Sequence, residues 1–116
     1  MSINDGSDIL QLASQKQLSE CTGQDVAIIV FGAPWCHPCQ VQWPFLYRVA
    51  EQSPQPVTLA QVDAEEYESL AKSYQIEGLP TILLFHQGVL FRRFIGVQTT
   101  EEILTAISEN QGRQDR

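Results

Sequence analysis

Residues 26–31, which read VAIIVF, restrict the fold of this chain more than any other segment. The run is rich in β-branched side chains and does not alternate between apolar and polar positions. Such a run is typical of a strand that is covered on both faces, because every side chain then has to be apolar. We therefore expect residues 26–31 to form a strand in the middle of a sheet.

Further strands and helices are expected after this run. The predicted strands are residues 57–63, 81–86 and 89–95, and the predicted helices run from Cys36 to about Gln52, from Glu65 to Tyr74, and from Thr99 or Thr100 to about Glu109. Gln87-Gly88 is expected to form a tight hairpin turn. Pro44 is expected to kink the first helix without ending it, because apolar positions continue beyond it. The order predicts an α/β fold with a central mixed β-sheet flanked by helices on both faces.

The two ends of the chain allow more than one interpretation. Residues 9–12 are predicted to form an edge strand, followed by a short helix that Ser14 caps and that ends at Gly23. A single helix from Asp8 to Cys21 is the alternative. A single domain is expected over residues 1–110, followed by a frayed polar tail at residues 111–116.

Composition and charge disfavour several classes of function. Seven Lys and Arg against fourteen Asp and Glu give a net charge of −7 without a basic patch, so nucleic acid is not an expected partner. No apolar stretch approaches the ~20 residues of a membrane span, and no secretory signal is visible. We therefore expect a cytoplasmic protein without a membrane partner. The odd number of cysteines, three, does not suit a disulfide-stapled secreted domain.

Residues 33–40, which read APWCHPCQ, place two cysteines close together just after the predicted central strand. If Cys36 begins the following helix, free backbone N–H groups and the helix dipole favour its thiolate. Cys39 then lies on the same helix face, where its sulfur can reach Cys36. This arrangement predicts Cys36 as the attacking nucleophile and Cys39 as the resolving thiol, in a cycle that needs sulfurs of unequal exposure.

The residues around the pair are expected to modulate its chemistry. Pro38 costs no hydrogen bond in the first helical turn and stiffens it, and Trp35 is expected to shield the site. A protonated His37 would stabilise the thiolate and make the pair more oxidising, unless its side chain points into solvent and does little.

Zinc binding and a permanent structural disulfide are alternative interpretations of the cysteine pair. A structural zinc site needs four ligands, and Cys21 and His86 are the further candidates beyond His37, with no second close pair. We therefore expect no metal and no cofactor other than a redox-active Cys36-Cys39 disulfide. Cys21 is interpreted as a small buried residue and His86 as exposed at a strand end.

At this point the sequence resembles the thioredoxin family over nearly its whole length. The matching features are the strand ending at Phe31, the run Trp35-Cys36-His37-Pro38-Cys39, Pro44, Val62-Asp63, the run Gly78-Leu79-Pro80-Thr81, Gly88 and Gly96. The resemblance implies a thioredoxin fold with Pro80 in the cis form beside the cysteines. It also implies an apolar rim on which an extended substrate segment rests, made by Trp35, Pro38, Leu79, Pro80, Ile95 and Gly96. For Leu79 and Ile95, plain core packing is the alternative.

Two positions depart from the pattern of the family. Val30 stands where an aspartate usually lies beneath the second cysteine, and Gln61 stands where a lysine usually faces that aspartate. Losing both together avoids a buried charge without a partner. Cys39 must then lose its proton to water, to His37 or to the leaving thiolate.

The cysteine pair and the resemblance together predict a thiol–disulfide oxidoreductase that reduces protein disulfides. We expect a monomer that receives electrons from a separate reductase. Two alternatives stay open. A thioredoxin-like binding or chaperone module with weak redox turnover is favoured by the missing acid–base pair at Val30 and Gln61, and a more oxidising oxidase or isomerase is favoured by His37.

Overall fold

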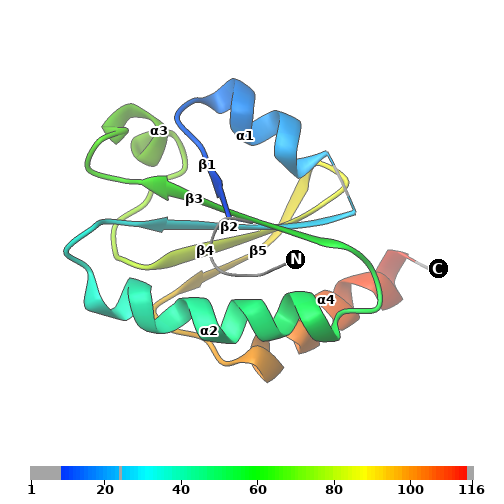
Figure 1. Ribbon diagram of the computed structural model, residues 1–116. Coiled ribbons are helices and arrows are strands. Elements are labelled where there is room, and N and C mark those ends of the chain that lie inside the picture. The colour runs from blue at the N-terminus through cyan, green and yellow to red at the C-terminus, as the bar shows by residue number, and fades with distance from the viewer. Residues whose placement is uncertain (1–8, 24, 115–116) are drawn as a thin grey trace, which may run out of the picture.

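A five-stranded mixed sheet forms the centre of a computed structural model, which describes residues 9–23 and 25–114 (Figure 1). The elements are β1 (Leu10–Gln11), α1 (Gln15–Thr22), β2 (Val26–Gly32), α2 (His37–Gln52), β3 (Val57–Asp63), α3 (Glu68–Ser73), β4 (Thr81–His86), β5 (Val89–Ile95) and α4 (Thr100–Gln114). The strand order is β1-β3-β2-β4-β5. Because β2 pairs in parallel with β3 and antiparallel with β4, the sheet is mixed, as the sequence predicts.

β2 lies in the middle of the sheet and is buried on both faces. None of the side chains of residues 26–31 is more than 1% exposed. Because successive side chains of a strand point to opposite faces, the run feeds two separate cores. Ala27, Ile29 and Phe31 pack with residues of α1 and α3, whereas Val26, Ile28 and Val30 pack with residues of α2 and α4. Figure 1 shows these two helix pairs on opposite sides of the sheet.

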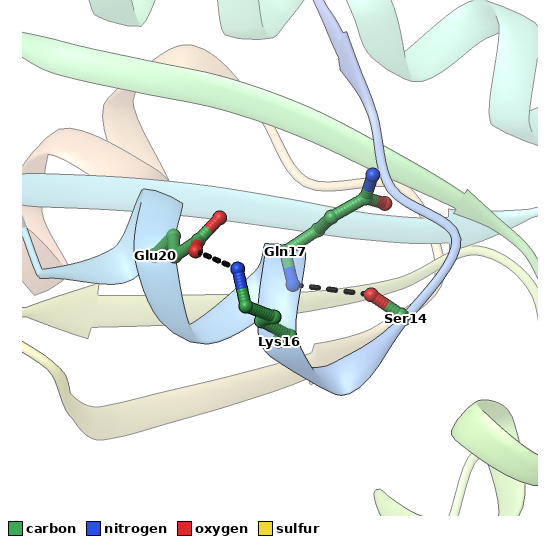
Figure 2. A network of polar contacts seen from close by, with 4 residues as sticks. All are labelled: Ser14, Lys16, Gln17 and Glu20. Carbon is green, nitrogen blue, oxygen red and sulfur yellow. Dashed lines mark hydrogen bonds and ion pairs between the residues drawn. The ribbon is translucent and has the colours of Figure 1, made fainter.

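The amino-terminal strand and helix confirm the preferred interpretation over a single long helix. β1 pairs in parallel with β3 at the sheet edge, and Ser14 is the N-cap of α1, since its Oγ accepts the N–H of Gln17 at 3.2 Å. Figure 2 shows this bond and the ion pair between Lys16 and Glu20 one turn further on. That pair is exposed, so it adds little stability. Asp8 lies outside the described residues.

The helices α3 and α4 differ from their predicted bounds. α3 begins at Glu68 rather than Glu65, because Oδ1 of Asp63 accepts the N–H groups of Glu65 (3.0 Å) and Glu66 (3.1 Å) and holds a turn there. α4 continues to Gln114, beyond the predicted end at Glu109. The expected frayed tail is therefore helical through residue 114, and its last two residues lie outside the described part of the chain.

The structure agrees with the sequence at Pro44 and at the turn of Gln87 and Gly88, and differs from it at His86. α2 continues through Pro44 without a break. Gln87 and Gly88 both have positive φ, at 49° and 85°, which suits the tight turn between β4 and β5. The sequence predicts an exposed His86, and this is wrong: the residue is 8% exposed, because it ends a strand whose side chains are all buried.

A buried amide attaches the segment after β5 to α2. Gln42 is fully buried, its Nε2 donates to the carbonyl of Gln98 at 2.9 Å, and its Oε1 accepts the N–H of Gln98 at 2.7 Å. One turn further along α2, the carbonyl of Phe45 accepts a hydrogen bond from Thr100 at 2.9 Å. The chain that leads out of β5 is therefore fixed to the helix that follows the cysteine pair.

Replacing Gln42 by Leu should destabilise the protein with little change in the volume of the core. Both backbone groups of the half-buried Gln98 would lose their partner, so we expect the free energy of unfolding to fall by about 1–3 kcal/mol in urea denaturation. Gln52→Leu, at the exposed end of the same helix, is the matched control and should change it by less than about 0.5 kcal/mol. Equal losses in both variants would contradict a structural role for the buried amide.

Candidate active site

The segments that carry the predicted site residues meet at one edge of the sheet, at the left in Figure 1, where β2 ends and α2 begins. Thr81 pairs with Phe31 on one side and with Ile95 on the other. The N–H of Gly96 donates to the carbonyl of Pro80 at 2.8 Å, and the peptide bond before Pro80 is cis. The end of β2, the start of β4 and the end of β5 are thus brought together beside the cysteines.

Cys36 and Cys39 form a disulfide across the first turn of α2, with their Cα atoms 5.3 Å apart. Cys36 is the N-cap residue rather than the first helical residue, and its Sγ accepts the N–H of Cys39 at 3.2 Å. When the disulfide opens, this N–H and the positive end of the helix dipole favour a thiolate at Cys36. The expected helix-start environment is therefore present, with Cys36 one position earlier in the helix than predicted.

The expected difference in exposure between the two sulfurs is absent in this disulfide form. Cys36 is 3% exposed and Cys39 is 5% exposed, because the covalent bond holds both side chains against the helix start. Their surroundings differ instead. Cys39 packs against Gly32 and lines a pocket, whereas Cys36 does not line that pocket.

The residues of the predicted apolar rim differ in exposure. Trp35 is 65% exposed and Ile95 is 63% exposed, so core packing is the wrong interpretation of Ile95. Leu79 is half-buried and packs against the core cluster on the side of α1 and α3. Pro80 is buried and Gly96 is half-buried. His37 and Pro38 are exposed in the first turn of α2.

A pocket of about 470 Å³ lies between the first turns of α2 and the ends of β1, β2 and β3. Cys39, Val30 and Gln61 line it, so the two positions that depart from the family pattern lie in its wall. Nε2 of Gln61 donates to Oε1 of Gln11 at 2.9 Å. The other lining residues are Leu12, Ala13, Gly32, Ala33, Pro34, Gln40, Trp43, Val62, Asp63, Glu66 and Tyr67.

The far wall of this pocket is acidic. Asp63 ends β3, and Glu66 and Tyr67 follow in the turn before α3. Burial of the Tyr67 phenol, together with the charge and hydrogen bonding of Glu66 and the charge of Asp63, raises the pKa of Tyr67. These side chains and Gln11 are neighbours of Cys39 in the pocket that the sequence did not predict. The signal that could have found them is the parallel pairing of β1, β2 and β3, whose carboxyl ends share one edge.

Comparison with known proteins assigns the chain to a family. The family model for thioredoxin matches residues 9–109. The chain belongs to the thioredoxin family. It is 39% identical over 83 residues to thioredoxin Y2, chloroplastic, of Arabidopsis thaliana, covering 72% of this chain and 50% of that protein. It is 29% identical over 103 residues to thioredoxin of Chlamydia trachomatis, covering 89% of this chain and 100% of that protein.

A solved structure confirms the thioredoxin fold. A single-site mutant of thioredoxin from Halobacterium salinarum superposes with a TM-score of 0.79 and 31% sequence identity, over 88% of this chain and 89% of that one. The chain spans half the length of the chloroplastic thioredoxin Y2 that it matches.

Residues 9–23 and 25–114 contain neither a candidate metal site nor a candidate membrane span. No group of three or more His, Cys, Asp or Glu side chains in these ranges is arranged to hold a metal ion. Over the same ranges, no helix is both long and apolar enough to cross a bilayer.

Adding a methyl group at Gly32 should disturb the disulfide. A Cβ built there would lie 3.0 Å from Sγ and 3.2 Å from Cβ of Cys39, so the cysteine would have to move. We expect Gly32→Ala to lower the free energy of unfolding of the oxidised protein by about 1–3 kcal/mol and to slow disulfide closure after reduction. Gly23→Ala, whose Cβ would meet only carbonyl oxygens at 3.9 Å, is the control. Unchanged stability and closure in Gly32→Ala would show that the glycine is not needed for this contact.

The remaining cysteine, Cys21, should be a slow thiol. It is free, half-buried and packed against the core cluster on the side of α1, and burial raises its pKa. Less of it is therefore thiolate at neutral pH than in the unfolded chain. We expect iodoacetamide to alkylate Cys21 of the oxidised protein more slowly in buffer than in concentrated urea at the same pH. Equal rates would contradict the burial of the thiol.

Proposed function

We propose that this protein is a thiol–disulfide oxidoreductase that reduces disulfides of protein substrates. The observation that carries the proposal is the Cys36-Cys39 disulfide at the start of α2, with Sγ of Cys36 accepting a helix N–H. A sulfur in this position is favoured as a thiolate, which is the attacking form in disulfide exchange.

The proposed reaction proceeds in two exchanges. The Cys36 thiolate attacks one sulfur of a substrate disulfide, forms a mixed disulfide, and releases the other substrate sulfur as a thiolate. Cys39, after losing its proton, attacks Sγ of Cys36, restores the Cys36-Cys39 disulfide and releases the second substrate thiolate. Two electrons pass from the cysteine pair to the substrate, and the released thiolates take protons from solvent.

The exposed side chains around the pair suit an extended polypeptide substrate. Trp35 precedes Cys36 in the chain, and Ile95 pairs with Thr81; both present large exposed apolar surfaces. Gly96, next to Ile95, donates its N–H to the carbonyl of Pro80, and Leu79 precedes that proline. In this proposal these residues bind the substrate segment, Pro38 stiffens the first helical turn, and a protonated His37 favours the thiolate form of Cys36.

The proposal needs no bound cofactor, since the sulfur pair itself carries the two electrons. A separate reductase has to reopen the disulfide after each cycle, and a monomer is sufficient because both cysteines lie on one helix start. A reducing compartment such as the cytoplasm suits this cycle, because thiols there are kept reduced.

A reduction assay with insulin and dithiothreitol tests the proposal. We expect the wild-type protein to accelerate insulin precipitation, Cys36→Ser to abolish the acceleration, and Cys39→Ser to lose turnover while accumulating mixed disulfides. Cys21→Ser is the matched control and should retain the activity, because Cys21 is not part of the pair. Acceleration that survives Cys36→Ser would contradict the redox role and would favour a binding or chaperone module.

A further inference from the structure

The pocket beside Cys39 provides a route for the proton that Cys39 has to lose in the proposed reaction. The second exchange requires Cys39 to lose its proton, yet the position beneath it is Val30, which is 1% exposed and has no titratable group. The pocket of about 470 Å³ borders Cys39. Since one water occupies about 30 Å³ in the liquid, the pocket has room for a chain of several molecules.

The walls of the pocket can hold such water. Val30 and Trp43 form an apolar side, whereas Gln11 and Gln61 present a fixed pair of amides joined at 2.9 Å. Each amide carries both donors and an acceptor, so the pair has hydrogen-bonding capacity left for water. A buried water needs two to four polar partners, and the amides and the acidic far wall supply them.

Two carboxylates line the far wall, and they differ in availability. Oδ1 of Asp63 already accepts two backbone N–H groups, at 3.0 and 3.1 Å, and holds the turn before α3. Glu66 lines the pocket, and because its side chain is exposed, it also reaches bulk solvent. Tyr67 follows it in the chain and lines the same wall. Glu66 is therefore the carboxylate that can both accept a proton from the pocket and release it outside.

We propose that the proton of Cys39 leaves through water in this pocket to the carboxylate of Glu66, with the amide pair of Gln61 and Gln11 positioning the water. The inference rests on the proposed function. In the mixed-disulfide state, the Cys39 thiol gives its proton to the adjacent water, and the water gives a proton to Glu66. The Cys39 thiolate then attacks Sγ of Cys36 and releases the substrate thiolate. Glu66 returns its proton to solvent, so the route changes no oxidation state.

The titratable groups that face this route come from three elements. Cys39 belongs to α2, Asp63 ends β3, and Glu66 and Tyr67 lie in the turn before α3. The segment around β1 contributes only the uncharged Gln11, Leu12 and Ala13. Glu65, next in the chain to Glu66, is exposed but does not line the pocket. It therefore offers a matched control that removes the same charge nearby.

Stopped-flow reaction of the reduced protein with one equivalent of the aromatic disulfide dithiobis(nitrobenzoate) separates the two exchanges. The first release of thionitrobenzoate reports attack by Cys36, and the second reports attack by Cys39. All proteins carry Cys21→Ser, so that no other thiol contributes. We expect Glu66→Gln to leave the first phase unchanged and to slow the second roughly tenfold near pH 7, somewhat less than the usual effect of a positioned base.

The sign of this effect distinguishes a proton route from simple electrostatics. Removing a negative charge near Cys39 would favour its thiolate and speed the second phase, whereas loss of the acceptor slows it. The slow phase of Glu66→Gln should recover as the pH approaches the ordinary thiol range of about 8.5, because hydroxide then removes the proton directly. Gln61→Leu, which keeps Glu66 but removes the positioning amide, should slow the second phase in the same direction.

The outcomes separate this inference from the proposed function. If the wild-type protein releases thionitrobenzoate in neither phase, the proposed function fails. If both phases occur and the second phase of Glu66→Gln equals that of Glu65→Gln across the pH range, the proton route through the pocket is wrong. A second phase that becomes faster in Glu66→Gln would overturn it as well.

Discussion

The burial of β2 on both faces is the constraint on which the rest of this structure depends. Six consecutive apolar side chains divide alternately between two cores, one with α1 and α3 and one with α2 and α4. A shift of one residue in the pairing would exchange the two sets, so the register is strongly fixed. That register places Gly32 at the end of the strand, against the sulfur of Cys39. The position of the disulfide is therefore a consequence of how the strand before it packs.

The site itself is made by the ends of elements rather than by their middles. A helix start supplies a free N–H to Cys36, the loop just before β4 supplies Pro80, and the end of β5 supplies Ile95. Ends are where backbone groups are left without regular partners, which is why they suit sulfur chemistry and binding. The buried Gln42 fixes one of these ends, because it joins the segment after β5 to α2 through Gln98.

The sequence was informative wherever one segment determines its own structure. The run at residues 26–31, the cysteine spacing and the hairpin turn at Gln87 and Gly88 each carry a local signal, and each was predicted correctly. The start of α3 was missed because one carboxylate oxygen of Asp63 captures two N–H groups that a helix would otherwise use. The pocket was missed because Gln11 and Gln61 are far apart in the sequence and meet only through the pairing of β1 with β3.

Val30 and Gln61, which stand in place of the usual acid–base pair, each contribute to the packing or hydrogen bonding of the fold. Val30 packs in the core cluster of α2 and α4, where a carboxylate would need a partner to offset its desolvation. Gln61 gives its hydrogen bond to Gln11, and so adds a side-chain link to β1, a strand of only 2 residues. A neutral hydrogen bond of this kind contributes about 1 kcal/mol and does not depend on pH. In place of a titrating pair in its interior, the chain has packing and an edge contact, and the carboxylates that line the pocket beside Cys39, Asp63 and Glu66, lie further out.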